Sequence, residues 1–498
     1  MPNRTLANDR AFPQYELNHI PVTIESTPPA DRKDLAEMST INTLVTEDRR
    51  LEMKTAVWVA TIACLALIFD GFDLVVYGTV MPTLLNDPSQ IGQLTPSTAG
   101  TLGSLALIGV LLGSFASGFI GDILGRKKML MIGIVWFSIG MAVTALTGTV
   151  FTFGLMRFVT GLGLGLVIAT AGPTIAEFAP KDKRGLFNAI VYSGVPAGGM
   201  FASLCGISLG EMIGWRGLFL IGATPILFLV PLAAMKLPES PRWLLSRGQE
   251  ERAIEIARET GVPLEDELAV RRATTVPKRT GYLALFTREF GLATLLMATM
   301  SFAGLLLTYG MNTWLPRIME SYGYADQKLW FPFVLNGAAV VGGLIAARAA
   351  DRNGKPQNMI ATTFALAAIS LVLMTFQFPL SLLFLFIGVA GIGILGTQVL
   401  VYGFQSNYYT SESRGAGVAA CATIGRAGGV FGPLIGGWLV AAGLGATEQF
   451  YAFAAVALVG AVVTFLVPRK HNTYLIEREA DARAKEQVAR DKERQPVA

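Results

Sequence analysis

The sequence predicts an all-α integral membrane protein whose twelve transmembrane helices form two pseudo-symmetric six-helix bundles. Its composition is the first observation, since 52% of the 498 residues are apolar and only 15% are charged, whereas soluble domains carry about 25% charged residues. The second is a series of twelve apolar runs, each of about 20 residues, the length that an α-helix needs to cross roughly 30 Å of hydrocarbon. The third is a pair of polar loop motifs that recurs at a nearly constant offset in the two halves of the chain.

The apolar runs and the polar segments between them define the expected organisation of the chain. A central cytoplasmic loop, residues 237–288, separates an N-terminal bundle at 51–236 from a C-terminal bundle at 289–467. Residues 1–50 lack the apolar core of a secretory signal peptide, so we expect a mostly disordered tail, and 468–498 form a second, charged tail. The expected spans are 56–85, 98–120, 129–147, 150–178, 186–209, 215–236, 289–315, 328–350, 357–376, 380–403, 416–442 and 449–467.

Basic residues in the short loops predict the orientation in the membrane, because cytoplasmic loops are enriched in Lys and Arg. With the N-terminus inside, the outer loops hold only Arg216, Arg317 and Lys328. We therefore expect a multi-pass protein of the cytoplasmic (inner) membrane with both tails in the cytoplasm. The net charge of +4 expresses this bias and does not indicate a nucleic-acid partner. The inner loops hold Arg126, Lys127, Lys128, Lys181, Lys183, Arg184, Arg348, Arg352, Lys355 and Arg414.

Two inner-loop motifs of the first half recur in the second half. The DILGR of 122–126 is echoed by the DRNGK of 351–355, 229 residues further on, and the DKRG of 182–185 is echoed by the ESRG of 412–415, 230 residues further on. Two matches at almost one offset indicate a duplicated six-helix unit. Transporters are commonly built from such repeats, with the substrate site near mid-membrane between them. We therefore expect alternating access, in which one bundle rocks against the other.

The first expected span carries two aspartates, Asp70 and Asp73, in the stretch FDGFDLVVYG. An ionised Asp at the centre of a spanning helix costs about 2.5–3.5 kcal/mol on insertion scales, and such residues normally mark an ion or substrate path. A spacing of three places both carboxyls on one helical face, where they interact, and burial disfavours their charged forms. Such a group can load a proton on one side of the membrane and release it on the other. The structural alternative is that each Asp pairs with a buried Arg and only locks the bundle.

Several motifs resemble the major facilitator superfamily over nearly the whole membrane region. They are GDILGRKK at 121–128 with its echo, Arg157 within RFVTGLGLG, and the paired RG loops. The resemblance implies the twelve-helix fold of two bundles and a role for Arg157 in proton coupling or packing. Glu177 ends the fourth span, where we expect it to brace the loop at Arg184. The residues expected to act at the cytoplasmic gate are Asp122, Arg126, Glu177, Arg184, Asp351 and Arg414.

Within that superfamily, DGFD at 70–73 resembles the aromatic acid:proton symporters, which carry benzoate, 4-hydroxybenzoate and related acids. TYGMNTWLP at 308–316 and PESPRWLLSRG at 238–248 also fit this branch, although the second motif is shared with sugar porters. The resemblance implies proton-coupled uptake of a small aromatic carboxylate, with Asp70 and Asp73 essential to transport. We expect a monomer whose partners are that carboxylate, protons and the lipid bilayer.

A carboxylate substrate needs a buried cation, and arginine offers a forked donor that matches its two oxygens. Arg426 lies near the middle of its span, at the depth of Asp70 but in the opposite bundle. We expect Arg426 to bind the substrate carboxylate; an internal ion pair or snorkelling is the alternative. An aromatic ring needs flat apolar walls with a few polar groups. The candidates for those walls are Tyr77, Tyr309, Asn312, Gln398 and Tyr402.

Other functions remain open at this point. The sequence holds no recognisable metal-ligand cluster and no nucleophile with its base, so we expect no cofactor, no metal and no enzymatic activity. PESPRW leaves a sugar or polyol:proton porter possible. A drug:proton antiporter would use Asp70 as the ligand of a cationic cargo. A non-transporting membrane sensor of aromatic acids would bind its ligand without accumulation.

Overall fold

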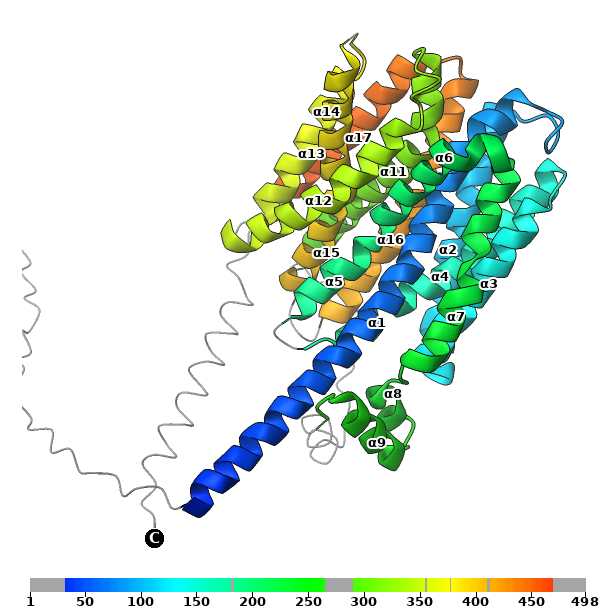
Figure 1. Ribbon diagram of the computed structural model, residues 1–498. Coiled ribbons are helices and arrows are strands. Elements are labelled where there is room, and N and C mark those ends of the chain that lie inside the picture. Colours follow the sequence, from blue (N-terminus) through cyan, green and yellow to red (C-terminus); the bar gives the residue numbers. More distant parts are fainter. Residues whose placement is uncertain are drawn as a thin grey trace, which may run out of the picture. The chain divides into compact units, whose positions relative to one another are not determined.

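A computed structural model gives the structure of residues 32–180, 183–264, 290–353, 356–376, 378–409 and 413–468. The chain divides into two compact units, residues 1–49 and residues 50–498. The predicted tail segments 1–31 and 469–498, and residues 265–289 of the predicted central loop, lie outside the described residues. Within the described ranges every regular element is helical (Figure 1).

The N-terminal bundle contains seven helical elements that make six crossings. The first helix begins earlier than the predicted span, and residues 49–86 of it form the apolar membrane segment. The fifth and sixth crossings share one helical stretch, residues 184–236. Gly214 interrupts that stretch with a positive φ of 65°, a conformation that glycine adopts without strain, so the chain kinks there between the two crossings. The elements are α1 (Arg32–Asn86), α2 (Pro96–Leu124), α3 (Arg126–Ala145), α4 (Val150–Phe178), α5 (Arg184–Tyr192), α6 (Gly194–Ala223) and α7 (Pro225–Lys236).

The C-terminal bundle supplies the other six crossings of the described chain. One of them is built from three consecutive elements, because the π-helix η2 interrupts the α-helix that runs from residue 380 to residue 408. The helix that starts at Trp330 has a shorter apolar segment than the others. The elements are α11 (Gly291–Ser321), α12 (Trp330–Asn353), α13 (Pro356–Leu373), α14 (Leu380–Gly391), η2 (Ile392–Gly396), α15 (Thr397–Tyr408), α16 (Arg414–Ala441) and α17 (Ala446–Leu466).

The predicted central loop is partly helical where the structure describes it. It contains α8 (Pro241–Ser246) and α9 (Glu250–Thr260). The Ser240 hydroxyl caps α8 by accepting a hydrogen bond of 3.0 Å from the Trp243 amide. These two helices share a small apolar core of their own, formed by Leu244, Leu245, Ala253, Ala257 and Leu264. In Figure 1 they lie beyond the end of α7.

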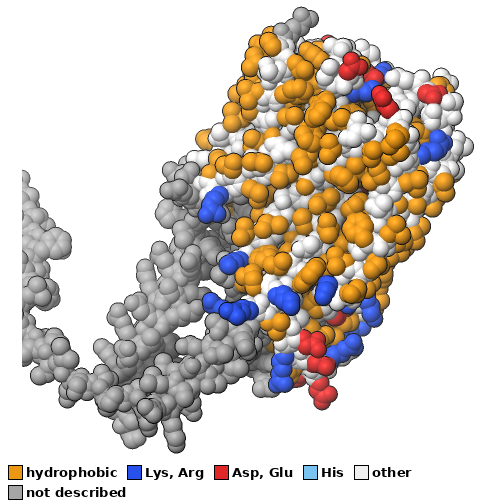
Figure 2. Space-filling view, viewed as in Figure 1, with side chains coloured by type: hydrophobic (Ala, Val, Ile, Leu, Met, Phe, Trp, Pro, Cys, Tyr) orange, Lys and Arg blue, Asp and Glu red, His pale blue; other side chains and the backbone are white. Residues whose placement is uncertain are grey.

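The surface of the spanning helices is largely apolar. Phe115 and Phe119 on α2 and Phe465 on α17 are each 66% exposed. Figure 2 shows apolar side chains over the middle of the visible face and Lys and Arg side chains gathered near one end. Exposed apolar surface of this extent is not found on soluble monomers, so the protein is a multi-pass membrane protein. We call the end where α2 meets α3, with Arg126, Lys127 and Lys128, the basic end.

Candidate functional site

The two acidic residues lie on α1, which contacts both bundles. Asp70 is 7% exposed and Asp73 is 3% exposed. Glycines on α1 allow its neighbours to approach closely, because a Cβ at Gly71 would collide with the carbonyl oxygen of Val195 on α6, and one at Gly78 with that of Asn312 on α11. The carboxyl groups are thus held at the contact between the two halves of the molecule.

Asp73 forms a buried ion pair. The Nη1 atom of Arg157 on α4 lies 2.5 Å from its Oδ1 atom, and both side chains are almost completely buried. The same guanidinium lies 5.1 Å from the centre of the Tyr77 ring, whose hydroxyl donates a hydrogen bond of 2.6 Å to the Ala99 carbonyl. A guanidinium over an aromatic face is favourable. Arg157 is therefore fixed by an acid on one side and a ring on the other.

Asp70 has different surroundings. In the part of the chain that the structure describes, no donor lies within hydrogen-bonding or ion-pair distance of its carboxyl group. Its charge interacts over a longer range with Asp73 and with Arg426 of the opposite bundle. The predicted interaction between the two aspartates is present. The structural alternative was that each Asp pairs with a buried Arg, and only Asp73 has such a partner.

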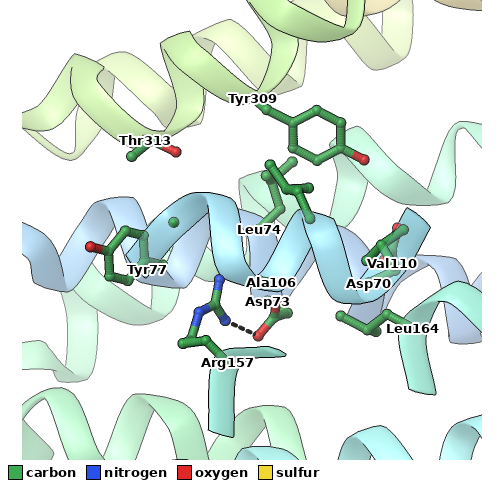
Figure 3. A pocket seen from close by; sticks show the side chains of 12 residues that line it. Asp70, Asp73, Leu74, Tyr77, Ala106, Val110, Arg157, Leu164, Tyr309 and Thr313 are labelled. Atoms are coloured by element: carbon green, nitrogen blue, oxygen red, sulfur yellow. Dashed lines mark hydrogen bonds and ion pairs between the residues drawn. The ribbon is translucent and has the colours of Figure 1, made fainter. Parts of the chain in front are cut away.

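Both carboxyls line one cavity between the bundles. It holds about 360 Å³ of empty space, including the space at its mouth, and its walls come from α1, α2, α4 and α11. Figure 3 shows the Asp73–Arg157 pair on one side of α1 and Tyr309 of α11 on the other. The lining residues are Asp70, Asp73, Leu74, Tyr77, Gly103, Ala106, Leu107, Val110, Arg157, Leu164, Tyr309 and Thr313.

Arg426 of the C-terminal bundle interacts electrostatically with two residues that line the cavity, Asp70 and Tyr309, although it is not itself one of the lining residues. It lies on α16 and is half-buried. It interacts electrostatically with Asp70, Tyr192 and Tyr309. Among the described residues it has no carboxylate within ion-pair distance, so the predicted alternative of an internal ion pair finds no partner there. A guanidinium in this setting is available to an anionic ligand.

Tyrosines from both bundles surround Arg426. The rings of Tyr192 on α5 and Tyr402 on α15 lie 6.2 Å apart, centre to centre, and join the two bundles. Tyr309 packs against Gly429 on α16 and interacts with Tyr402. Tyr192 was not among the predicted site residues; the signal for it is a tyrosine in the middle of an otherwise apolar run, in the stretch IVYSG.

One predicted substrate residue, Asn312, has its amide hydrogen-bonded within the protein. Asn312 is completely buried and its amide is used within the protein: Nδ2 donates 2.8 Å to the Thr308 carbonyl, and Oδ1 accepts 2.7 Å from Asn336 on α12. Of the predicted substrate residues, Tyr77 and Tyr309 line the cavity, whereas Asn312, Arg426, Gln398 and Tyr402 are not among its lining residues. The shared helical face with Tyr309 suggested a ligand, but the neighbouring helix covers Asn312 and leaves its neighbour Thr313 at the cavity instead.

The predicted gate residues are described only in part. Arg126 and Glu177 approach to 3.8 Å at the basic end, while Arg184 donates a hydrogen bond of 3.4 Å to the Ala179 carbonyl. Glu177 therefore contacts Arg126 at the α2–α3 turn, while residues 181–182 of the loop that it was predicted to brace lie outside the described residues. The side chains of Asp122, Asp351 and Arg414 lie outside the described part of the structure.

Glu239 from the PESPRW motif strengthens the α2–α3 turn. Its Oε1 atom accepts hydrogen bonds of 3.1 Å from the backbone amides of Lys127 and Ser240. A carboxylate is favourable beside the first amides of a helix, where the helix dipole is positive. The motif that the sequence shares with sugar porters therefore acts here as a cap for α3, remote from the cavity.

The bundles are in close contact on the side of the cavity away from the basic end. A Cβ at Gly100 of α2 would collide with the Pro433 carbonyl of α16, and one at Gly103 would press tightly against the Pro433 ring. The Ser104 hydroxyl donates 2.6 Å to the Val430 carbonyl, and Arg317 reaches Asn86 at 3.4 Å. These contacts hold the two bundles together at the end opposite the basic end.

Two helical bundles around a charged cavity at mid-membrane define the architecture of a secondary transporter. The model of the Major Facilitator Superfamily matches residues 63–406 and 337–496, and the chain belongs to this family. Among solved structures, the xylose transporter XylE of Escherichia coli in an inward open conformation has a TM-score of 0.68 at 19% identity, covering 85% of this chain and 99% of that chain. A partially occluded inward open structure of XylE gives a TM-score of 0.64 at 21% identity, covering 83% and 100%. These matches show the fold.

Sequence relatives belong to a narrower group. The benzoate transport protein of Acinetobacter baylyi is 31% identical over 82% of this chain and 89% of its own length. The gentisate transporter of Corynebacterium glutamicum is 30% identical over 82% and 87%, and the 4-hydroxybenzoate transporter PcaK of Pseudomonas aeruginosa is 28% identical over 79% and 87%. The predicted resemblance to the aromatic acid transporters of the superfamily is confirmed.

Proposed function

We propose that the protein imports a small aromatic carboxylate of the benzoate or hydroxybenzoate class together with protons, by alternating access. The observation that carries this proposal is the electrostatic interaction between Asp70, a cavity carboxyl group without a close partner among the described residues, and Arg426 of the opposite bundle. The names of the sequence relatives support the substrate class.

The proton site is Asp70. Its carboxyl group has no close donor among the described residues, so its protonation breaks no contact. Asp73 has a different task, because its proton uptake would break the pair with Arg157. Asp73 and Arg157 set the charge around Asp70 and are part of the coupling machinery.

Coupling between proton and substrate follows from competition for Arg426. When Asp70 is ionised, it attracts the guanidinium of Arg426 and adds negative charge to the cavity. Once Asp70 is protonated, Arg426 can take the substrate carboxylate as its counter-ion. Each ligand therefore favours the other, as linkage requires. One monoanion that enters with one proton moves no net charge. The pH gradient, and not the membrane potential, therefore drives this uptake.

The aromatic ring is bound by the tyrosines near Arg426 and by Tyr77, which lines the cavity beside Arg157. Tyr309 and Tyr402 come from the C-terminal bundle, whereas Tyr77 and Tyr192 come from the N-terminal bundle. Contacts from both halves let the bound ring promote their movement relative to each other. The substrate set is therefore Arg426 with Tyr77, Tyr192, Tyr309 and Tyr402, and Gln398 is considered below.

The basic end faces the cytoplasm in this proposal, with both termini on that side of the cell membrane, because short basic loops remain inside. Contact between the bundles at the opposite end then corresponds to a state closed toward the outside. The gate residues at the basic end, with Arg126 and Glu177 in contact, control the cytoplasmic opening. A single chain supplies both walls of the cavity, so a monomer is sufficient.

The test is accumulation of labelled benzoate and 4-hydroxybenzoate by purified protein in liposomes, with an imposed pH gradient that is acidic outside. We expect uphill uptake that a protonophore abolishes, and no competition by glucose or by an aromatic amine. Competition by glucose would favour a sugar porter. Binding without accumulation would identify a sensor and contradict the proposal.

A further inference from the structure

Gln398 on α15 is a buried amide without a partner. The residue is 7% exposed, and neither its Nε2 nor its Oε1 atom has a hydrogen-bond partner within the described ranges. Burying an amide without hydrogen bonds is unfavourable. A group of this kind inside a transporter is explained if a ligand completes its hydrogen bonds.

The local backbone fixes where this amide points. The π-helix η2 ends at Gly396, directly before Thr397 and Gln398, and π-helical turns occur frequently at functional sites. The Thr397 hydroxyl donates a hydrogen bond of 2.7 Å to the Thr363 hydroxyl of α13. Thr397 therefore fastens this turn to α13 and has its own polar group satisfied, while the next residue, Gln398, extends toward α11.

A glycine on α11 leaves room for the amide. A Cβ on Gly304 would collide with the Gln398 Oε1 atom. Seven residues further along α15, Gln405 also faces α11, but its Nε2 atom donates 2.6 Å to the Ser301 hydroxyl and 3.1 Å to the Met297 carbonyl. At the α11–α15 contact, the Nε2 atom of Gln405 thus has two acceptors. The amide of Gln398 has no hydrogen-bond partner among the described residues.

The register of these antiparallel helices places Gln398 at the depth of the proposed ring site. Gln398 meets Gly304 of α11. Tyr309 lies five residues beyond Gly304 toward the end opposite the basic end, and Tyr402 lies four residues beyond Gln398 toward the basic end. In depth, the amide therefore lies between two of the tyrosines that surround Arg426.

We infer that Gln398 binds a phenolic hydroxyl on the substrate ring, so that the preferred cargo is a hydroxylated aromatic acid rather than benzoate itself. The inference rests on the proposed function. A phenol can donate to Oε1 and accept from Nε2, which matches both open positions of the amide. Arg426 then binds the carboxylate and Gln398 binds the hydroxyl, so separate residues recognise the two ends of the substrate. An unsubstituted ring leaves the amide unpaired, and sites of this type reject such analogues strongly.

The experiment is a competition assay with purified protein in lipid nanodiscs, with labelled 4-hydroxybenzoate as the probe. Unlabelled benzoate, 3-hydroxybenzoate and 4-hydroxybenzoate compete, and the ratio of apparent Kd values for benzoate and the better hydroxybenzoate is the readout. We expect a ratio of about tenfold or more for the wild type. In Gln398→Met the ratio should fall toward one, because hydroxybenzoate binds more weakly and benzoate more tightly.

Two further variants separate recognition from packing. Gln405→Met removes a glutamine of the same helix whose Nε2 is satisfied, so it should lower thermal stability and keep the ratio. Gly304→Ala displaces the Gln398 amide and should lower the ratio as Gln398→Met does. An unchanged ratio in Gln398→Met, or a preference for benzoate in the wild type, overturns this inference alone. Absence of binding of every aromatic acid to the wild type overturns the proposed function as well.

Discussion

At the scale of single residues, two carboxyl groups on one helical face have different surroundings. Asp73 is fixed by Arg157 at 2.5 Å, whereas Asp70 has only longer-range charge interactions with Asp73 and Arg426. Removing one partner of a buried ion pair leaves an uncompensated charge, while removing a carboxyl that has no close partner does not. The two positions should therefore respond differently to the same substitution.

The first prediction contrasts Asp73→Asn with Asp70→Asn. Both variants should lose proton-coupled uptake, but Asp73→Asn should also destabilise the protein by about 3–5 kcal/mol, because Arg157 is left without its counter-ion. Asp70→Asn should unfold at nearly the wild-type temperature. Thermal unfolding in detergent, with transport measured on the same preparations, checks both. Equal stability of the two variants would contradict the assigned difference.

The second prediction concerns Arg426. Arg426→Lys keeps the positive charge and loses the forked donor, so we expect the apparent Kd for an aromatic carboxylate to rise about tenfold or more, with little change in thermal stability. Binding measurements on the purified variant check this. Arg317→Lys, at the end opposite the basic end, is the matched control and should bind as the wild type does. Wild-type affinity in Arg426→Lys would disprove its role.

The sequence allows the charged residues of the cavity to be predicted, because an ionisable group inside an apolar span is conspicuous. It does not reveal which carboxyl meets Arg157, since Asp70 and Asp73 share a face and only the packing of α4 against α1 decides. The same limit explains Asn312, which shares a face with Tyr309 but is covered by Asn336. Tyr192 was missed because a tyrosine within an apolar span is a weak signal: unlike a charged side chain, it has no large free-energy cost in the membrane.

At the scale of helices, close approach of α1 to its neighbours is the feature that positions the site. Gly78 lies against the Asn312 carbonyl across the boundary between the bundles, as Gly71 lies against Val195 within the first bundle. The apolar spans themselves are predictable because bilayer thickness fixes their length. The π-helix at 392–396 and the kink at Gly214 are not predictable from the sequence, because they depend on local packing rather than on composition.

The third prediction tests this packing. Gly78→Val should force α1 away from α11 and cost about 1–3 kcal/mol, as overpacking of a filled interior does, with loss of transport. Gly210→Ala is the control, because a Cβ there meets open space, and it should leave both stability and transport unchanged. Thermal unfolding and uptake measure the two effects. Normal transport in Gly78→Val would show that this contact is dispensable.

At the scale of the whole molecule, the halves are in close contact on the side of the cavity away from the basic end. Pro433 packs against α2 at the end opposite the basic end, and the cavity is lined by residues of both halves, with its charged residues on the N-terminal side. The two-bundle fold was predictable from the repeated loops, and the family match confirms it. The positions of the domain boundaries and the orientation of the termini remain predictions.

A fourth prediction concerns the driving force. If one proton accompanies one monoanion, uptake should follow the pH gradient and ignore an imposed voltage, since no net charge crosses; a single net charge would contribute about 2.3 kcal/mol per 100 mV. Liposomes with a potassium diffusion potential and no pH gradient measure this. Strong voltage-driven accumulation would indicate that more than one proton accompanies each anion.

Asp70 is the group that binds and releases the transported proton in the proposed mechanism. The direct measurement compares two kinds of transport by the Asp70→Asn variant in liposomes. One is accumulation of labelled hydroxybenzoate driven by a pH gradient, and the other is exchange of labelled for unlabelled substrate at equal pH on both sides. A permanently neutral side chain imitates the protonated state, so we expect exchange to continue while accumulation disappears. Gradient-driven accumulation at the wild-type level in this variant would contradict the mechanism.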